Sequence, residues 1–202
     1  MSTGTPGETS VAPESQGRAR AQRADAQRNL DALLVAARDV FACQGCDAPV
    51  RQIAESAGVG VGTVYRHFPQ RSDLIIAVFR RELDACADAA ADYLRDYPPG
   101  EAVERWMQRY VDFMGTKRGL AAALHSGDPA YSALPGCFQD RLVPALQSLL
   151  DAAAAAGEIR PGADPVDLIS AAASMANYDM EQARRMVALL VDGLRHGAQA
   201  GA

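Results

Sequence analysis

The sequence predicts an all-α protein, and two observations support this fold class. Alanine is frequent and clustered, as in residues 152–156, whereas aromatic residues make up only 6% of the 202 residues. This composition favours helices over β-sandwiches and barrels. Apolar residues also recur at intervals of three and four through most of the chain, which is the period of an amphipathic helix. With 49% apolar residues in the broad sense, the chain can bury a core without disulfides or a structural metal.

The first helix is expected to follow a polar tail. Residues 1–17 are rich in Ser, Thr, Gly, Pro and Glu, show no apolar periodicity and are expected to be disordered. A helix is expected from Arg18, and apolar side chains between Leu30 and Phe41 share one of its faces. This helix should end near Gln44, because Gly45 can adopt the left-handed conformation that stops a helix.

Two short helices come next, and the turn of about four residues between them is typical of a helix-turn-helix. The first is expected over Val50–Ala57 and the second over Val61–Phe68, which Pro69 ends. Gly58 allows the sharp turn between them, because glycine adopts positive φ freely. Apolar residues of the turn and of both helices should pack against the first helix, namely Ile53, Ala54, Val59 and Val64.

The rest of the chain is expected to form further helices. A long helix is expected over Arg71–Tyr97, and a Pro-Pro-Gly sequence ends it. Pro144 should kink a later helix or delay its start. The later helices are expected at residues 101–115, 117–126, 137–156, 165–177 and 180–196, separated by stretches that contain Gly, Pro or Asn.

The chain is expected to divide into a tail (1–17), a helix-turn-helix domain (18–70) and a larger helical domain (71–202). Charge is distributed unevenly along it. The whole chain carries a net charge of −5. Residues 18–81 nevertheless hold ten Arg and six acidic residues, whereas the chain from Glu82 onward holds ten basic and seventeen acidic residues. Such an asymmetry is typical of nucleic-acid binding, although an uneven solvated surface would have the same composition.

The second helix of the helix-turn-helix leaves polar side chains on its outer face. A helix fits the major groove of DNA, where contacts to base edges read the sequence and contacts to phosphates set the position. We expect Thr63 and Tyr65 to meet bases. We expect His67, Arg71 and Arg51 to meet phosphates. Arg66 lies on the same outer face, and Gly62 lets the backbone approach the DNA closely.

The stretch IAESAGVGVGTVYRHFPQRSDL (residues 53–74) resembles the N-terminal domain of the TetR/AcrR family of bacterial transcription regulators. The resemblance covers about residues 25–83. It implies an all-helical homodimer in which a three-helix DNA-binding head is joined by a fourth helix to a larger ligand-binding and dimerisation domain. It also implies that Thr63, Tyr65 and His67 face operator DNA. Such a protein is expected to be a repressor that leaves the operator when a small-molecule effector binds.

The sequence departs from the family pattern at two positions in the head. Many members carry Ser where Gly60 stands, and most carry an aromatic residue where Cys46 stands. Glycine is a poorer helix cap than serine, and cysteine is a smaller plug than an aromatic ring.

The family resemblance also assigns the end of the chain to dimerisation, through about residues 165–196. One face of the last helix carries the apolar residues Ala183, Met186, Val187, Leu190 and Leu194. This stripe fits an interface between two copies, but it equally fits a contact with the protein's own core.

Aromatic and methionine side chains of the larger domain could line an apolar effector pocket, although each by itself is typical of a core. These are Trp106, Tyr110, Phe113, Met114, Phe138, Met175 and Tyr178.

Other classes of function have little support. Cys43-x-x-Cys46 lacks the second ligand pair of a zinc site, and no nucleophile or phosphate-binding motif is present, so no metal, cofactor or catalytic residue is expected. No segment is apolar enough to span a membrane or act as a signal peptide, so the expected location is the cytoplasm. The alternative function is an all-helical small-molecule or lipid-binding protein whose helix-turn-helix is only structural.

Overall fold

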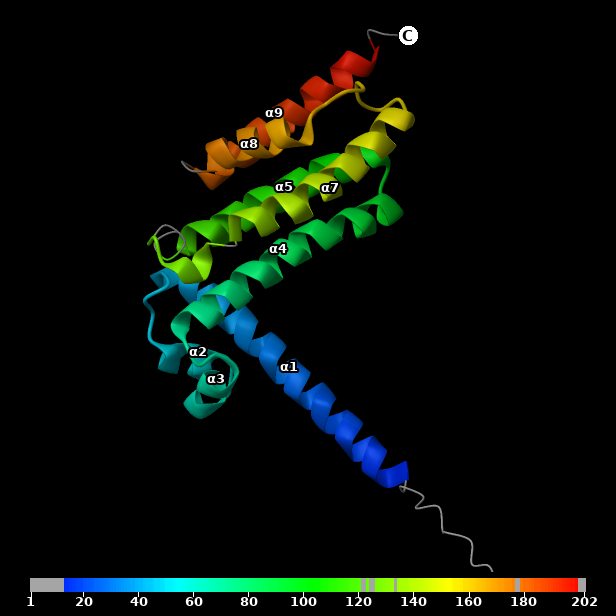
Figure 1. The fold of residues 1–202 in the computed structure, drawn as a ribbon. Coiled ribbons are helices and arrows are strands. Elements are labelled where there is room, and N and C mark those ends of the chain that lie inside the picture. The colour runs from blue at the N-terminus through cyan, green and yellow to red at the C-terminus, as the bar shows by residue number, and fades with distance from the viewer. Residues whose placement is uncertain (1–12, 121–122, 124–125, 133, 177–178, 200–202) are drawn as a thin grey trace, which may run out of the picture.

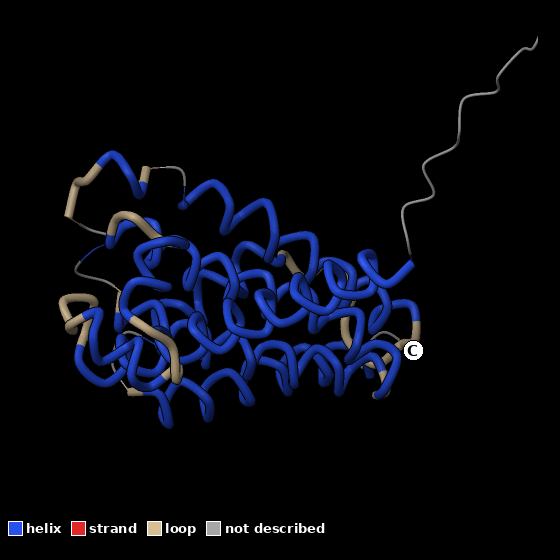
Figure 2. Tube along the Cα trace, turned by 90° about the horizontal axis from the view of Figure 1, so that it is seen from below, coloured by secondary structure: helices blue, strands red, loops and turns tan. Residues whose placement is uncertain are grey.

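In the computed structural model, every regular element of the described residues is helical, as the sequence predicts (Figures 1 and 2). The structure describes residues 13–120, 123, 126–132, 134–176 and 179–199. The elements are α1 (Pro13–Gln44), α2 (Val50–Ser56), α3 (Val61–His67), α4 (Arg71–Asp96), α5 (Pro99–Gly119), the 3₁₀ turn η1 (Pro129–Tyr131), α7 (Leu134–Ala155), α8 (Pro165–Ala176) and α9 (Met180–Gln199).

The helices form a small head and a layered body (Figure 1). In the body, α4 packs against α5 and α7, and α5 packs in turn against α8 and α9. In the head, α1 packs against α2 and α2 packs against α3, while α1 also contacts α4 and α5. One continuous apolar core joins the two parts, running from Leu33 and Ile53 in the head to Trp106 and Val187 in the body.

The turns of the head have the predicted backbone geometry. Gly45 ends α1 with φ of +81°, and Gly58 turns the chain between α2 and α3 with φ of +66°. A side chain at either position would be strained, because L-residues rarely adopt positive φ. Phe68, which precedes Pro69, leaves the helical region at φ −131° and ψ 84°.

The start of α1 differs from the prediction. The helix begins at Pro13, so residues 13–17 are helical and not disordered, while residues 1–12 lie outside the described part. The segment after Pro13 is rich in Ala, Arg and Gln, which have high helix propensity, and this offsets its lack of apolar periodicity. In Figure 1 the first half of α1 projects away from the other helices.

The middle of the body differs as well, because α5 runs through Gly115 to Gly119 without the predicted break. A Cβ atom at Gly115 would lie 3.2 Å from Cε of Met180. Gly115 therefore allows the Met180 side chain to approach α5 closely, and it does not end the helix. Residues 117–119, where the sequence predicts the start of a separate helix, belong to α5, and of the rest of that helix (120–126) residue 123 is helical while 121, 122, 124 and 125 lie outside the described part. Pro144 lies inside α7, which starts at Leu134, so of the kink or late start expected there the late start does not occur.

Candidate nucleic-acid interface

One face of α3 is anchored in the core of the head. Val64 is 1% exposed and packs with Ile53 and Ala54 of α2, which are fully buried. The turn supports this packing, since Val59 is half-buried and its N–H donates to the carbonyl of Ala54 at 3.0 Å. The predicted packing of the helix-turn-helix is thus confirmed, and the other face of α3 points outward.

The outward face carries the side chains that the sequence assigns to DNA. Tyr65 is 53% exposed, Arg66 and His67 are exposed, and Thr63 is half-buried. Within the described residues, no hydrogen bond or ion pair engages the side chains of Tyr65, Arg66 or His67. These groups are therefore available to a partner outside the chain.

The two glycines at the start of α3 are not required by the fold. Gly60 caps the helix with φ −74°, and a Cβ atom there would come no closer than 4.0 Å to Oγ1 of Thr63. A Cβ atom at Gly62 would meet nothing within 4 Å. Both positions face open space, which suits the close approach of a partner's backbone to the helix N-terminus.

Replacing Gly62 by alanine should therefore separate stability from DNA binding. Alanine loses less conformational entropy in a helix, so the free energy of unfolding should stay unchanged or rise by up to about 1 kcal/mol. Affinity for operator DNA should fall, because the new methyl group occupies space between α3 and the duplex. Chemical denaturation and a DNA titration measure the two effects, and unchanged DNA affinity would contradict this placement of Gly62.

The two predicted phosphate contacts outside α3 differ in their surroundings. The side chain of Arg51 is 81% exposed and pairs with Glu55 at 2.9 Å on the surface of α2. Such an exposed pair is weak and exchanges readily for a phosphate. Arg71 is half-buried, and its guanidinium donates to the main-chain carbonyls of Cys46 and, at 2.8 Å, Ala48. This placement differs from that of a solvent-facing phosphate contact, because the loop between α1 and α2 already engages two of its donors.

Four of the predicted effector residues form an aromatic cluster, in which Phe138 is half-buried and the other three are buried. Trp106 stacks on Tyr110 with ring centroids 5.9 Å apart, and Phe138 lies 6.1 Å from both Tyr110 and Phe113. Phe79, which the sequence does not single out, joins at 5.7 Å from Phe113. The three remaining predicted residues are not part of this ring cluster: Met114 is buried, Met175 is half-buried against the core, and Tyr178 lies outside the described residues.

One polar atom inside this cluster lacks a partner. The hydroxyl group of Tyr110 is buried and makes no hydrogen bond within the described structure, whereas Nε1 of Trp106 donates to the carbonyl of Cys86 at 2.8 Å. Burial raises the pKa of the Tyr110 hydroxyl, so this group stays a neutral donor at physiological pH. An unpaired buried hydroxyl costs free energy that a ligand with an acceptor could offset.

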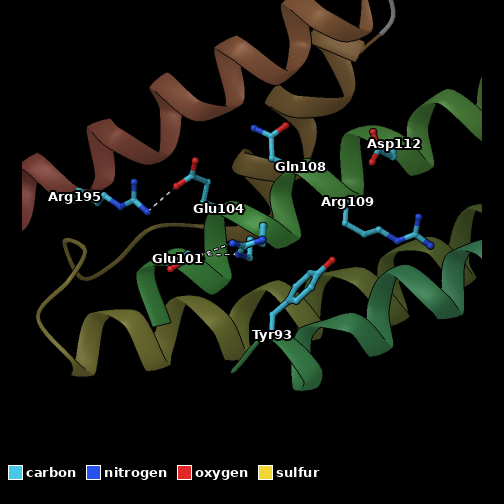
Figure 3. Close-up of a pocket in the computed structure, with 8 residues that line it drawn as sticks. Tyr93, Glu101, Glu104, Gln108, Arg109, Asp112 and Arg195 are labelled. Atoms are coloured by element: carbon cyan, nitrogen blue, oxygen red, sulfur yellow. Dashed lines mark hydrogen bonds and ion pairs between the residues drawn. The ribbon is translucent and has the colours of Figure 1, made fainter. Parts of the chain in front are cut away.

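Two of the cavities on the described surface of the body have no predicted effector residue in their lining. One, of about 640 Å³, lies along α5 between α4 and α9 (Figure 3). The other, of about 560 Å³, lies between α4 and α7 and is lined by small residues together with Asp88, Asp140 and Arg141. The described effector residues are packed together in the core and line neither cavity, so their role in effector binding remains a prediction.

A buried carboxylate joins head and body. Glu82 of α4 is 5% exposed and pairs with Arg38 of α1 at 3.6 Å and with Arg109 of α5 at 3.9 Å. The sequence carries a signal for this site, because Glu82 interrupts the apolar stripe between Phe79 and Cys86.

The face assigned to dimerisation divides into two parts. Ala183, Val187 and Leu194 are buried in the protein's own core and Leu190 is half-buried against it, which was the alternative interpretation of the stripe. Met186, in contrast, is 41% exposed, and Leu189, which the predicted stripe does not include, is 71% exposed on α9. Val166 of α8 is also exposed, at 45%.

The cysteines and acidic residues show no arrangement for metal or redox chemistry in the described part of the chain. Cys43 is exposed and Cys46 is buried, without a disulfide between them, and no group of three metal-binding side chains occurs there. Burial raises the pKa of Cys86 to about 12, which keeps its thiol protonated and unreactive. Among the described helices, none is both long and apolar enough to cross a membrane.

Two family models match the chain, one on each part of the fold. The model described as bacterial regulatory proteins of the tetR family matches residues 33–78. The model described as the C-terminal domain of SbtR-like transcriptional regulators matches residues 98–196. Residues 79–97, which include Glu82, lie between the two matches.

Known proteins resemble the chain along most of its length. A TetR transcriptional regulator of Streptomyces coelicolor is 41% identical with a TM-score of 0.72, over 82% of this chain and 97% of that one. A TetR regulatory protein of Mycobacterium vanbaalenii is 35% identical with the same TM-score, over 86% and 99%. HTH-type transcriptional regulators of Staphylococcus aureus are 38% identical over 108 residues, and the match spans only 58% of their length. The helix-turn-helix geometry and these matches together show that the chain belongs to the TetR family of bacterial regulatory proteins.

Proposed function

We propose that this protein is a sequence-specific DNA-binding transcriptional regulator that places α3 in the major groove of its operator. The observation that carries the proposal is the division of α3 into a buried face at Val64 and an outward face with Tyr65, Arg66 and His67. A protein that binds only an apolar ligand, which is the alternative function, does not require polar side chains without hydrogen-bond partners on this helix. Base contacts come from Thr63 and Tyr65, and phosphate contacts come from His67, Arg66 and Arg51.

The proposed regulator acts as a homodimer in the cytoplasm. A single seven-residue helix reaches few base pairs, whereas two copies related by a two-fold axis reach two half-sites. The exposed apolar side chains on α8 and α9 supply the surface for the second copy. Family membership also supports this arrangement, since TetR proteins act as dimers.

Replacing Leu189 by glutamate should convert the dimer to monomers. Among the described residues, Leu189 is the most exposed large apolar side chain, and a carboxylate there would be buried against the partner copy without a counter-ion. Sedimentation should show the monomer mass, and operator affinity should fall with the loss of the second half-site. Ala155→Glu, on an exposed position of α7, is the matched control and should stay dimeric. A dimeric Leu189→Glu protein would show that the interface lies elsewhere.

The proposed regulator represses until a small molecule binds in its body. The aromatic cluster around Trp106 and Tyr110 supports an apolar effector whose acceptor group meets the unpaired Tyr110 hydroxyl. Such an effector releases the operator only if it binds one arrangement of the two heads more tightly than another.

Binding to the DNA that flanks the gene tests the proposed function. The dimer should bind one fragment with at least about a thousandfold preference over unrelated DNA at physiological salt. If each dimer contacts about six to ten phosphates, affinity should fall by orders of magnitude between about 50 and 200 mM salt. Equal, weak binding to all fragments would contradict the proposal.

A further inference from the structure

We infer that the groove along α5, between α4 and α9, binds a small carboxylate that also carries a hydrogen-bond donor, and that this ligand weakens the contact between body and head. The effect on DNA rests on the proposed function, whereas binding in the groove does not. The groove is separate from the aromatic cluster, and its volume of about 640 Å³ suits a small metabolite.

Most charges in this groove are already neutralised. Arg105 pairs with Glu101 at 2.7 Å. Arg195 pairs with Glu104 at 2.8 Å, as Figure 3 shows. Asp112 pairs with Arg184 at 2.7 Å. The acidic residues of the groove therefore offer little repulsion to an anion.

Arg109 is held less closely than the paired arginines Arg105 and Arg195 of the groove. Its guanidinium is 3.9 Å from Glu82, beyond hydrogen-bond distance, and it makes no hydrogen bond to any described residue. The side chain is 31% exposed, so a ligand can reach it from the groove. A carboxylate is the natural partner, because a guanidinium offers two parallel N–H donors that match its two oxygens.

The neighbouring Gln108 defines the second requirement of the ligand. Its amide nitrogen donates to the carbonyl of Arg184 at 3.0 Å, but its Oε1 atom is buried and accepts no hydrogen bond. If the half-buried Gln108 side chain turns its oxygen toward the groove, a hydroxyl or amino group on the ligand supplies the missing donor and removes the cost of an unpaired acceptor.

Binding at Arg109 reaches the head through Glu82. The Glu82 carboxylate is 6% exposed and is shared between Arg109 and Arg38 of α1. A ligand carboxylate competes with Glu82 for Arg109, which leaves a buried charge with less compensation. The loss of this compensation changes how α4 packs against α1 and α5, and α1 in turn packs against α2 of the helix-turn-helix. Operator affinity should fall, because the ligand and the DNA then favour different arrangements of α1, α4 and α5.

Three four-carbon dicarboxylates test the inference on the full-length protein at constant ionic strength. Malate carries a hydroxyl group, aspartate an ammonium group, and succinate neither. At about 10 mM, malate or aspartate should raise the melting temperature by about 2–4 °C and weaken operator binding by at least about threefold, while succinate does less. Arg109→Gln should lose these responses, whereas Arg160→Gln, an exposed arginine outside the groove, should keep them.

A second variant keeps the test decisive if Arg109→Gln does not fold. Gln108→Met removes the unpaired oxygen and should abolish the preference for malate or aspartate over succinate. The inference is overturned if the three compounds act alike or have no effect, or if Arg109→Gln responds like the original protein. A protein that melts higher with malate but binds no DNA would refute the proposed function and retain the groove as an anion site.

Discussion

Replacing Tyr65 by alanine is expected to lower operator affinity by at least about thirtyfold, since each base contact contributes about 1–3 kcal/mol and a dimer loses two of them. The free energy of unfolding should change by less than about 0.5 kcal/mol, because Tyr65 is 53% exposed and makes no hydrogen bond in the described structure. Fluorescence anisotropy with labelled operator DNA and urea denaturation measure the two quantities.

Tyr65→Phe is the matched variant for this prediction. It keeps the ring and removes only the hydroxyl group, so its affinity distinguishes a ring contact from a hydrogen bond to DNA. If Tyr65→Ala instead lowers the unfolding free energy by several kcal/mol, Tyr65 belongs to the core of the head. If Tyr65→Ala binds the operator normally, α3 is not the helix that reads DNA.

Replacing Arg71 by alanine should also abolish most operator binding, but for a different reason. Its guanidinium supports the loop between α1 and α2 through the carbonyls of Cys46 and Ala48. Losing these two charge-assisted hydrogen bonds should lower the unfolding free energy by about 2–4 kcal/mol and leave α2 and α3 poorly positioned. Denaturation followed by circular dichroism measures this loss.

The salt dependence of binding and a lysine variant separate this role from a phosphate contact. A positioning residue leaves the slope of log affinity against log salt unchanged, whereas two lost phosphate contacts per dimer reduce its magnitude by about 2. Arg71→Lys keeps the charge, but the lysine ammonium group cannot donate to both carbonyls as the planar guanidinium does. It should therefore bind DNA nearly as poorly as Arg71→Ala. Full rescue by lysine with a restored slope would favour the phosphate contact.

The sequence predicts the head of this protein well because its signals are local. Gly58, Val59 and Val64 lie within one motif, and each determines its neighbours through short-range geometry. The side chains that the motif turns outward, such as Tyr65, follow from the same spacing. Amphipathic periodicity likewise places α4 within one residue of its observed bounds.

Features that depend on contacts between distant segments are harder to predict. Arg71 meets carbonyls more than twenty residues away, and Glu82 gathers arginines from two other helices. Gly115 looks like a helix break until the side chain of Met180 is seen against it. In each case the position of a second helix, and not the local sequence, decides the role of the residue.

Methylation interference on the operator fragment tests most directly whether α3 enters the major groove. Methylation of guanine N7 places a methyl group in the major groove, and methylation of adenine N3 places one in the minor groove. The account predicts two symmetric clusters of interfering guanines, about one helical turn or a multiple of it apart, and their loss in Tyr65→Ala. Interference at adenine N3 alone, or at a single unpaired cluster, would contradict it.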